Sequence, residues 1–163
     1  MVEGLGTSVQ SWSSGFESRR ALHFRYILGV DPLHKGWLAG IIDGEGTITL
    51  QRRGSAGWRY PCISLTSTDR EIVECVKILI GGTICNVKQY KTRMKPAWIL
   101  KVSGRRALDA IELIGVHLLC PKKRQRALYI KQFYPIVSVR NGQYTAEQRE
   151  LKKTFERCFF ELA

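Results

Sequence analysis

The chain has 163 residues, 44% of them apolar, which is enough for one domain with a hydrophobic core. Its 26 basic and 14 acidic residues give a formal charge of +12, so the expected partner is a polyanion. No apolar run reaches the roughly 18–20 residues that a membrane span requires. Composition therefore favours nucleic acid over a membrane as the partner.

The cysteines and histidines give no sign of a metal site or a disulfide framework. The number of cysteines is odd, and no CxxC pair or Cys/His cluster with metal-ligand spacing occurs. We therefore expect free thiols in a reducing compartment: the cytoplasm of a bacterium or archaeon, or a chloroplast or mitochondrion. The residues concerned are Cys62, Cys75, Cys85, Cys120 and Cys158, with His23, His34 and His117.

Residues 1–30 differ from the rest of the chain. The segment up to Ser18 is rich in Gly and Ser and has no sustained apolar period, which indicates a flexible or peripheral N-terminal extension. We expect residues 31–163 to form a single domain.

A glycine-rich apolar run follows, and it is predicted to be a helix. Asp31 supplies an N-cap and Pro32 a first helical residue, so the helix should begin near residue 33 and end at the glycines of positions 44 and 46. Gly36, Gly40 and Gly44 then lie on one face, since residues four apart are neighbours on a helix. Each glycine costs about 0.8–1 kcal/mol in a helix interior relative to alanine. The stripe therefore predicts close packing against a second helix.

Glu45 stands at the end of this helix, where the macrodipole is negative and a carboxylate is disfavoured. A bound divalent cation would remove the conflict. The alternative is a buried, glycine-rich core helix that ends in a solvated acid at a turn.

Two hairpins with period-two alternation are predicted next, separated by a helix. Thr47, Thr49, Gln51 and Arg53 share one polar face, residues 54–57 form a loop, and a second strand spans residues 58–66. A helix capped by Thr68 or Asp69 runs to Ile80 and stops at Gly81-Gly82. The second hairpin is expected over residues 83–91 and 97–103, with outward candidates Asn86, Lys88, Tyr90, Ile99 and Lys101.

Three helices complete the predicted order. The first spans residues 105–119, the second opens at Pro121 and runs to Tyr134, and Thr145 with Gln148 forms a capping box for the last. The class is therefore α+β, with a four-stranded antiparallel sheet covered by helices on one face.

The outer face of this sheet is a candidate surface for double-stranded DNA. Strands in a groove can read base edges through alternate side chains, while Lys and Arg neutralise phosphates. The alternative is a merely solvated face, since half-buried antiparallel sheets alternate in this way. The candidate DNA-binding residues are Thr47, Thr49, Gln51, Arg53, Tyr60, Ser64, Lys88, Tyr90 and Lys101.

The segment Leu38-Ala39-Gly40-Ile41-Ile42-Asp43-Gly44-Glu45-Gly46 resembles the motif that names the LAGLIDADG homing endonucleases, with conservative departures at positions 41, 44 and 45. The resemblance implies the αββαββα fold with a saddle-shaped sheet. Because the motif occurs once, it also implies a homodimer on a long, near-palindromic site. The implied dimer interface contains Gly36, Trp37, Gly40, Ile41 and Gly44.

The resemblance also implies an active site. Glu45 corresponds to the metal-binding acid, with Mg²⁺ as the expected ion, and Lys123 to a catalytic lysine for which Lys122 is the second choice. Asp43 is expected to be a structural hydrogen-bonding partner at the helix interface. The implied function is site-specific double-strand DNA cleavage by metal-dependent phosphodiester hydrolysis.

Two other functions are compatible with the same fold: an intron RNA maturase and a non-catalytic DNA-binding protein. Presence of both Glu45 and Lys123 favours cleavage, because binding of RNA or of an operator requires neither.

Overall fold

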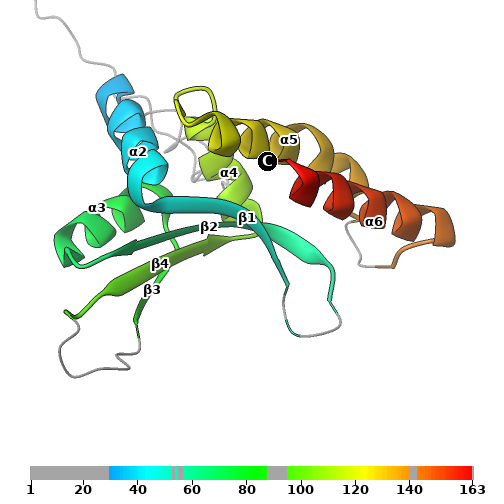
Figure 1. Cartoon of the computed structure of the whole chain (residues 1–163), viewed down its shortest axis with the longest axis horizontal. Helices are drawn as coiled ribbons and strands as arrows, with labels where there is room; N and C mark the ends of the chain where they lie inside the picture. The colour runs from blue at the N-terminus through cyan, green and yellow to red at the C-terminus, as the bar shows by residue number, and fades with distance from the viewer. Residues whose placement is uncertain (1–29, 53, 55–56, 88–94, 140–142, 163) are drawn as a thin grey trace, which may run out of the picture.

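The computed structural model describes residues 30–52, 54, 57–87, 95–139 and 143–162. Helices and strands follow one another as the sequence predicts, with two hairpins separated by a helix and three helices after them (Figure 1). The elements are α2 (Pro32–Glu45), β1 (Gly46–Arg52), β2 (Arg59–Ser67), α3 (Arg70–Ile80), β3 (Thr83–Asn86), β4 (Trp98–Ser103), α4 (Arg105–Ile114), α5 (Pro121–Val137) and α6 (Ala146–Glu161).

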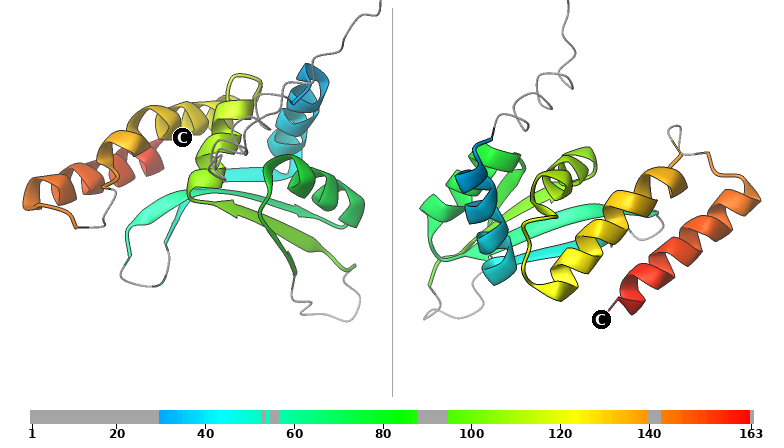
Figure 2. Two further views of the ribbon diagram at one scale, coloured as in Figure 1. Left: turned by 180° about the vertical axis from the view of Figure 1, so that it is seen from behind. Right: turned by 90° about the horizontal axis from the view of Figure 1, so that it is seen from above.

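The four strands form one antiparallel sheet in the order β1-β2-β4-β3. Helices α2, α3 and α4 lie over one face of this sheet, and the curved opposite face is left open by the described elements (Figure 1, Figure 2). Helices α5 and α6 pack side by side beyond β1. The predicted α+β architecture, with helices on one face of a four-stranded antiparallel sheet, is confirmed.

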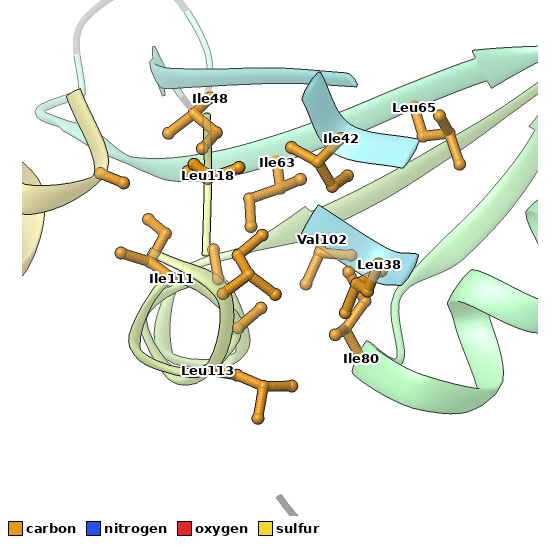
Figure 3. Close-up of a cluster of buried hydrophobic side chains, with 14 of the residues drawn as sticks. Leu38, Ile42, Ile48, Ile63, Leu65, Ile80, Val102, Ile111, Leu113 and Leu118 are labelled. Carbon is orange, nitrogen blue, oxygen red and sulfur yellow. The ribbon is translucent and has the colours of Figure 1, made fainter. Parts of the chain in front are cut away.

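The hydrophobic core lies between the sheet and its helices (Figure 3). Alternate strand residues point into it, and each buried aliphatic side chain contributes about 1.5–3 kcal/mol relative to exposure. Members of the core that are at most 2% exposed include Leu38, Ile42, Ile48, Leu50, Ile63, Leu65, Val76, Ile80, Leu100, Val102, Ile111 and Ile114. Within the described ranges, no helix combines the length and the apolar character needed to cross a membrane.

Side-chain caps begin three of the helices where the sequence places them. The carboxylate of Asp31 accepts the Leu33 N–H at 3.3 Å, and that of Asp69 accepts the N–H of Glu71 at 3.0 Å. The Thr145 hydroxyl and the side chain of Gln148 form the reciprocal capping box of α6. These predictions from local sequence are confirmed.

Two helix ends differ from the prediction. Helix α4 ends at Ile114, not at residue 119, and Gly115 caps it with a 2.8 Å bond from its N–H to the Ile111 carbonyl. Helix α5 continues through Pro135 to Val137, although an end at Tyr134 was predicted. Since Pro135 lies in the last turn, its missing N–H removes a hydrogen bond only at the end of the helix.

The predicted orientation of β3 is wrong by one residue. Asn86 pairs with Trp98, and Ile84 with the buried Leu100, so both face the helix side of the sheet. Thr83 and Cys85 occupy the outer face instead. The physical reason is the burial of Ile84 against the core, which fixes the alternation of this short strand.

Candidate functional site

The open face of the sheet carries a continuous set of polar side chains. Directly paired residues share a face, so the register places Thr47 beside Ser64, Ser64 beside Lys101, and Lys101 beside Thr83. Gln51 and Tyr60 pair near the end of the same face. The structure therefore brings together six of the predicted DNA-contact residues, Thr47, Thr49, Gln51, Tyr60, Ser64 and Lys101, each exposed or half-buried.

Three predicted contacts, Arg53, Lys88 and Tyr90, lie outside the described residues. The sequence prediction missed Thr83, which the corrected register of β3 adds to this face; with Ile84 and Cys85 on opposite faces, this strand of four residues carries no clear alternation that could have found it. Cys62 also sits on this face, between Thr49 and Ser103, but is only 2% exposed. Burial raises the pKa of the Cys62 thiol, so this position is uncharged at neutral pH, with Lys101 opposing the shift only in part.

Glu45 is the last residue of α2 and directly precedes β1. Its side chain is exposed, and it has no hydrogen bond or ion pair to the residues that the structure describes. The following residue, Gly46, caps the helix through its N–H, which donates to the Ile42 carbonyl. Glu45 thus lies at the junction between α2 and β1, two residues before Thr47 of the open face.

Hydrogen bonds donated by Lys123 of α5 and accepted by Asp43 of α2 join the end of α2 to the start of α5. The Lys123 Nζ donates to the carbonyl oxygens of Ile42 at 3.0 Å and Asp43 at 2.6 Å. The Asp43 Oδ2 accepts the N–H groups of Leu119 at 2.6 Å and Cys120 at 3.2 Å. A cation thus lies at the negative end of α2 and an anion at the positive end of α5, as the helix dipoles favour.

These bonds distinguish the two candidate lysines. Lys123 is half-buried and lies at the last turn of α2, close in the fold to Glu45, whereas Lys122 is exposed. The expected structural role of Asp43 agrees with its two backbone partners, although they belong to the α4–α5 connection and not to a second copy of α2.

One chain by itself supplies few ligands for a metal. No group of three or more His, Cys, Asp or Glu side chains gathers anywhere in the described ranges. The Asp43 Oδ2 accepts two backbone N–H groups, while its Oδ1 is buried and has no hydrogen-bond partner among the described residues, so the exposed carboxylate here is that of Glu45. Magnesium is commonly held by one or two carboxylates together with phosphate oxygens and waters, so a lone exposed carboxylate near a candidate nucleic-acid surface fits this ion.

The glycine stripe of α2 faces away from the core. A Cβ added at Gly36, Gly40 or Gly44 would meet no described atom within 4 Å, while Leu38 and Ile42 on the other side are fully buried. The alternative of a helix buried on all sides is therefore wrong. The neighbouring Trp37 is 38% exposed, so the stripe belongs to a surface with apolar character.

Comparison with known proteins gives one family and one fold. The model of the LAGLIDADG-like domain matches residues 32–115, which contain α2, the whole sheet, α3 and α4. No curated protein sequence matches the chain.

Similar solved structures include the homing endonuclease I-CvuI in complex with its target in the presence of Ca, with a TM-score of 0.57 and 15% identity over 86% of this chain and 85% of that one. The archaeal intron-encoded homing endonuclease I-Vdi141I complexed with DNA has a TM-score of 0.54 and 14% identity over 80% of this chain and 84% of that one. For I-SmaMI bound to uncleaved DNA with calcium ions, the values are 0.57 and 17% over 78% of this chain and 45% of that one.

At these identities the solved structures show the fold alone, whereas the family model covers more than half of the chain, including the motif helix and both hairpins. The chain belongs to the LAGLIDADG-like domain family.

Proposed function

We propose that this protein is a homing endonuclease, a site-specific enzyme that cleaves double-stranded DNA as a homodimer with Mg²⁺ as cofactor. The observation that carries the proposal is the position of Glu45: an exposed carboxylate without a partner among the described residues, at the end of the helix turn to which Lys123 bonds and two residues before Thr47 of the open polar face. The similar solved structures are homing endonucleases in complex with DNA.

The open face of the sheet supports DNA as the substrate. Gln51 has the amide geometry for a bidentate contact with adenine, and Lys101 can contact a phosphate or a guanine edge. The formal charge of +12 adds a long-range attraction that speeds association with a polyanion. Arg53, Lys88 and Tyr90 extend the proposed DNA-contact set beyond the described residues.

The glycine stripe supports a homodimer. The motif occurs once, and the stripe of α2 has open space where a second helix could approach closely. In the proposed interface, Gly36, Gly40 and Gly44 face the same residues of the partner, with Trp37 and Ile41 at the sides. This chain covers 85% of I-CvuI but only 45% of I-SmaMI. The I-SmaMI chain is therefore long enough to contain a second unit of this size.

A two-fold axis through the stripe would bring both Glu45 residues together, because each is the last residue of its α2. We propose that each carboxylate helps to hold a divalent ion against a scissile phosphate, and that the two subunits cut one strand each. When bound, Mg²⁺ supplies Lewis acidity and charge neutralisation at the phosphate.

Lys123 has a defined role in this proposal. An ammonium group has three N–H donors, and the carbonyls of Ile42 and Asp43 occupy two. The third remains for a phosphate oxygen, where it would stabilise the negative charge of the transition state. Asp43 holds the start of α5, and therefore Lys123, against the end of α2.

The test is selection of cleaved sites from a randomised duplex library with Mg²⁺ present, using the wild type, Glu45→Gln and Glu112→Gln. Glu112 is an exposed residue of α4 whose carboxylate lies 3.6 Å from Lys131, so its substitution is the matched control. We expect cleavage of a near-palindromic site by the wild type and the control. We expect Glu45→Gln to bind the same site without cutting it.

Other outcomes reverse the proposal. Cleavage by Glu45→Gln at the wild-type rate would contradict the metal assignment. Tight binding of intron RNA without nicking of any duplex would identify a maturase, and specific duplex binding by the wild type without cleavage would identify a non-catalytic DNA-binding protein.

A further inference from the structure

Helix α6 lies outside the segment matched by the family model, yet it contacts the hairpin formed by β1 and β2. The Glu156 carboxylate accepts the backbone N–H of Arg59 at 2.9 Å, and its other oxygen lies 3.5 Å from the Arg59 Nε. The Glu156 side chain is 13% exposed and that of Arg59 30%, so solvent screens this ion pair less than a surface one.

Arg59 is engaged on the helix side of the sheet, opposite to the face of Tyr60. Its guanidinium donates to the Leu50 carbonyl at 3.3 Å and lies 4.7 Å from the centre of the Phe160 ring. Successive residues of a strand point to opposite faces, and the next residue on the side of Arg59 is the buried Pro61. Arg59 therefore serves to join the strand to α6 and is not placed to contact a phosphate on the open face.

The contact is at the end of the hairpin, next to two candidate DNA contacts. Arg52 and Arg59 form the last pair of β1 and β2, and Gln51 with Tyr60 form the pair before it. Two arginines directly opposite each other destabilise a hairpin end, and the negative charge of Glu156 offsets this repulsion. A second contact lies close by, where the rings of Trp58 and Tyr144 are 5.4 Å apart.

Helix α6 is itself firmly attached to the domain, so it can serve as a support. Phe155 and Phe159 are at most 3% exposed, and the ring of Phe155 stacks on Tyr129 of α5 at 5.2 Å. The capping box at Thr145 stabilises the start of the helix. The contact with α6 therefore holds the hairpin end against the α5–α6 pair, which is itself packed into the domain.

We propose that Glu156 and Phe160 are positioning residues for DNA recognition: through Arg59 they fix the hairpin end, and so set the specificity of the base contacts made by Gln51 and Tyr60. This inference rests on the proposed function, since it concerns how the enzyme discriminates its target. Bidentate contacts with base edges tolerate displacements of only about 0.5 Å, so a hairpin end that moves reads its base pairs poorly.

The test measures relative cleavage of targets in which each base pair is substituted in turn. The Gln51→Ala protein first identifies the base pairs that this end of the sheet reads. The variants are Glu156→Ala, which removes the acceptor and the charge, Glu156→Gln, which keeps a neutral acceptor for the Arg59 N–H, and Phe160→Ala. The matched control is Glu150→Gln on the same helix, because Glu150 pairs with Lys153 at 2.7 Å, with both side chains largely exposed.

We expect Glu156→Ala and Phe160→Ala to lower discrimination at those base pairs by roughly fivefold or more, and elsewhere by less than about twofold. Glu156→Gln should show an intermediate loss, and Glu150→Gln none. The slope of log affinity against log salt concentration should stay unchanged, because Arg59 contacts no phosphate. If Glu156→Ala fails to fold, discrimination is measured with Glu156→Gln, which keeps the backbone hydrogen bond.

A uniform loss at all base pairs would indicate a merely structural role for Glu156 and overturn the inference. A shallower salt slope would overturn it as well, since Arg59 would then be a phosphate contact. If the wild type cuts its site and the Glu156 variants keep the wild-type profile, only the inference fails. If the wild type cuts no duplex, the proposed function fails and the inference fails with it.

Discussion

Substitution of Gly40 by alanine should change the stability of the subunit and that of the dimer in opposite directions. Gly40 lies in the interior of α2, and an added Cβ would meet no described atom within 4 Å. Alanine is favoured over glycine in a helix interior by about 0.8–1 kcal/mol. The free energy of unfolding of the isolated subunit should therefore rise by about 1 kcal/mol in Gly40→Ala.

The dimer responds differently because the stripe is the proposed close-contact surface. A methyl group forced into a packed interface costs about 1–3 kcal/mol, and two-fold symmetry introduces it once from each subunit. The dimer dissociation constant should thus rise by about 30-fold even at the lower end of this range. Cleavage at low protein concentration should fall accordingly and recover at high concentration.

Two measurements separate these effects: urea unfolding at a concentration where the subunits are dissociated, and sedimentation equilibrium of the DNA-free protein. Gly46→Ala is the contrasting variant, because its Cβ would lie 2.8 Å from the Ile42 Cα and so destabilise the subunit itself. An unchanged dissociation constant in Gly40→Ala, with cleavage intact, would refute the assignment of the stripe to the dimer interface.

Three further substitutions, with Lys122→Met as a control, test contacts near the site and between α5 and α6. Asp43→Ala leaves two backbone N–H groups without their acceptor, and urea unfolding should show a loss of about 1–3 kcal/mol. Lys123→Met should lower the free energy of unfolding by a similar amount and should also abolish cleavage. Lys122→Met should leave the free energy of unfolding unchanged in the same assay. Burial lowers the pKa of Lys152 from 10.5 to about 8. Between these pH values the unfolded chain binds more protons than the folded chain, so the free energy of unfolding of the wild type rises with pH in this range. Lys152→Met should abolish that rise in urea unfolding measured across this pH range, and an undiminished rise would contradict the role of Lys152.

Local signals in the sequence predicted most of the fold. Helix starts at Asp31, Asp69 and Thr145 depend on a side-chain oxygen and its nearest backbone N–H groups; Asp31 and Thr145 are predicted outright, and Asp69 is one of the two predicted caps of α3. Strand faces follow from alternation, which located Thr47 and Gln51 on the open side. Such features are predictable because the residues that decide them are neighbours in the chain.

Features decided by distant residues were not predictable in this way. The face of β3 depends on which residue meets the core, and a strand of four residues carries too little alternation to decide it. Lys152 is fully buried, with its Nζ 3.2 Å from the Ser138 Oγ and 4.1 Å from the centre of the Tyr134 ring. Those neighbours come from the end of α5, so only the packing of α5 on α6 shows why a lysine is accommodated there.

The proposed active-site residues show the same difference between local and distant determinants, and they change what supports a metal. A carboxylate at the negative end of a helix calls for a compensating cation, and from the sequence a bound divalent ion was the expected source. The structure supplies a cation from within the chain, because the Lys123 ammonium bonds to the carbonyls of Ile42 and Asp43 in the last turn of α2. The helix dipole therefore gives little independent support for a metal. The case for Mg²⁺ depends instead on the exposed carboxylate of Glu45, which has no partner among the described residues, and on its proposed symmetry mate, since each would need a divalent ion when a scissile phosphate approaches it.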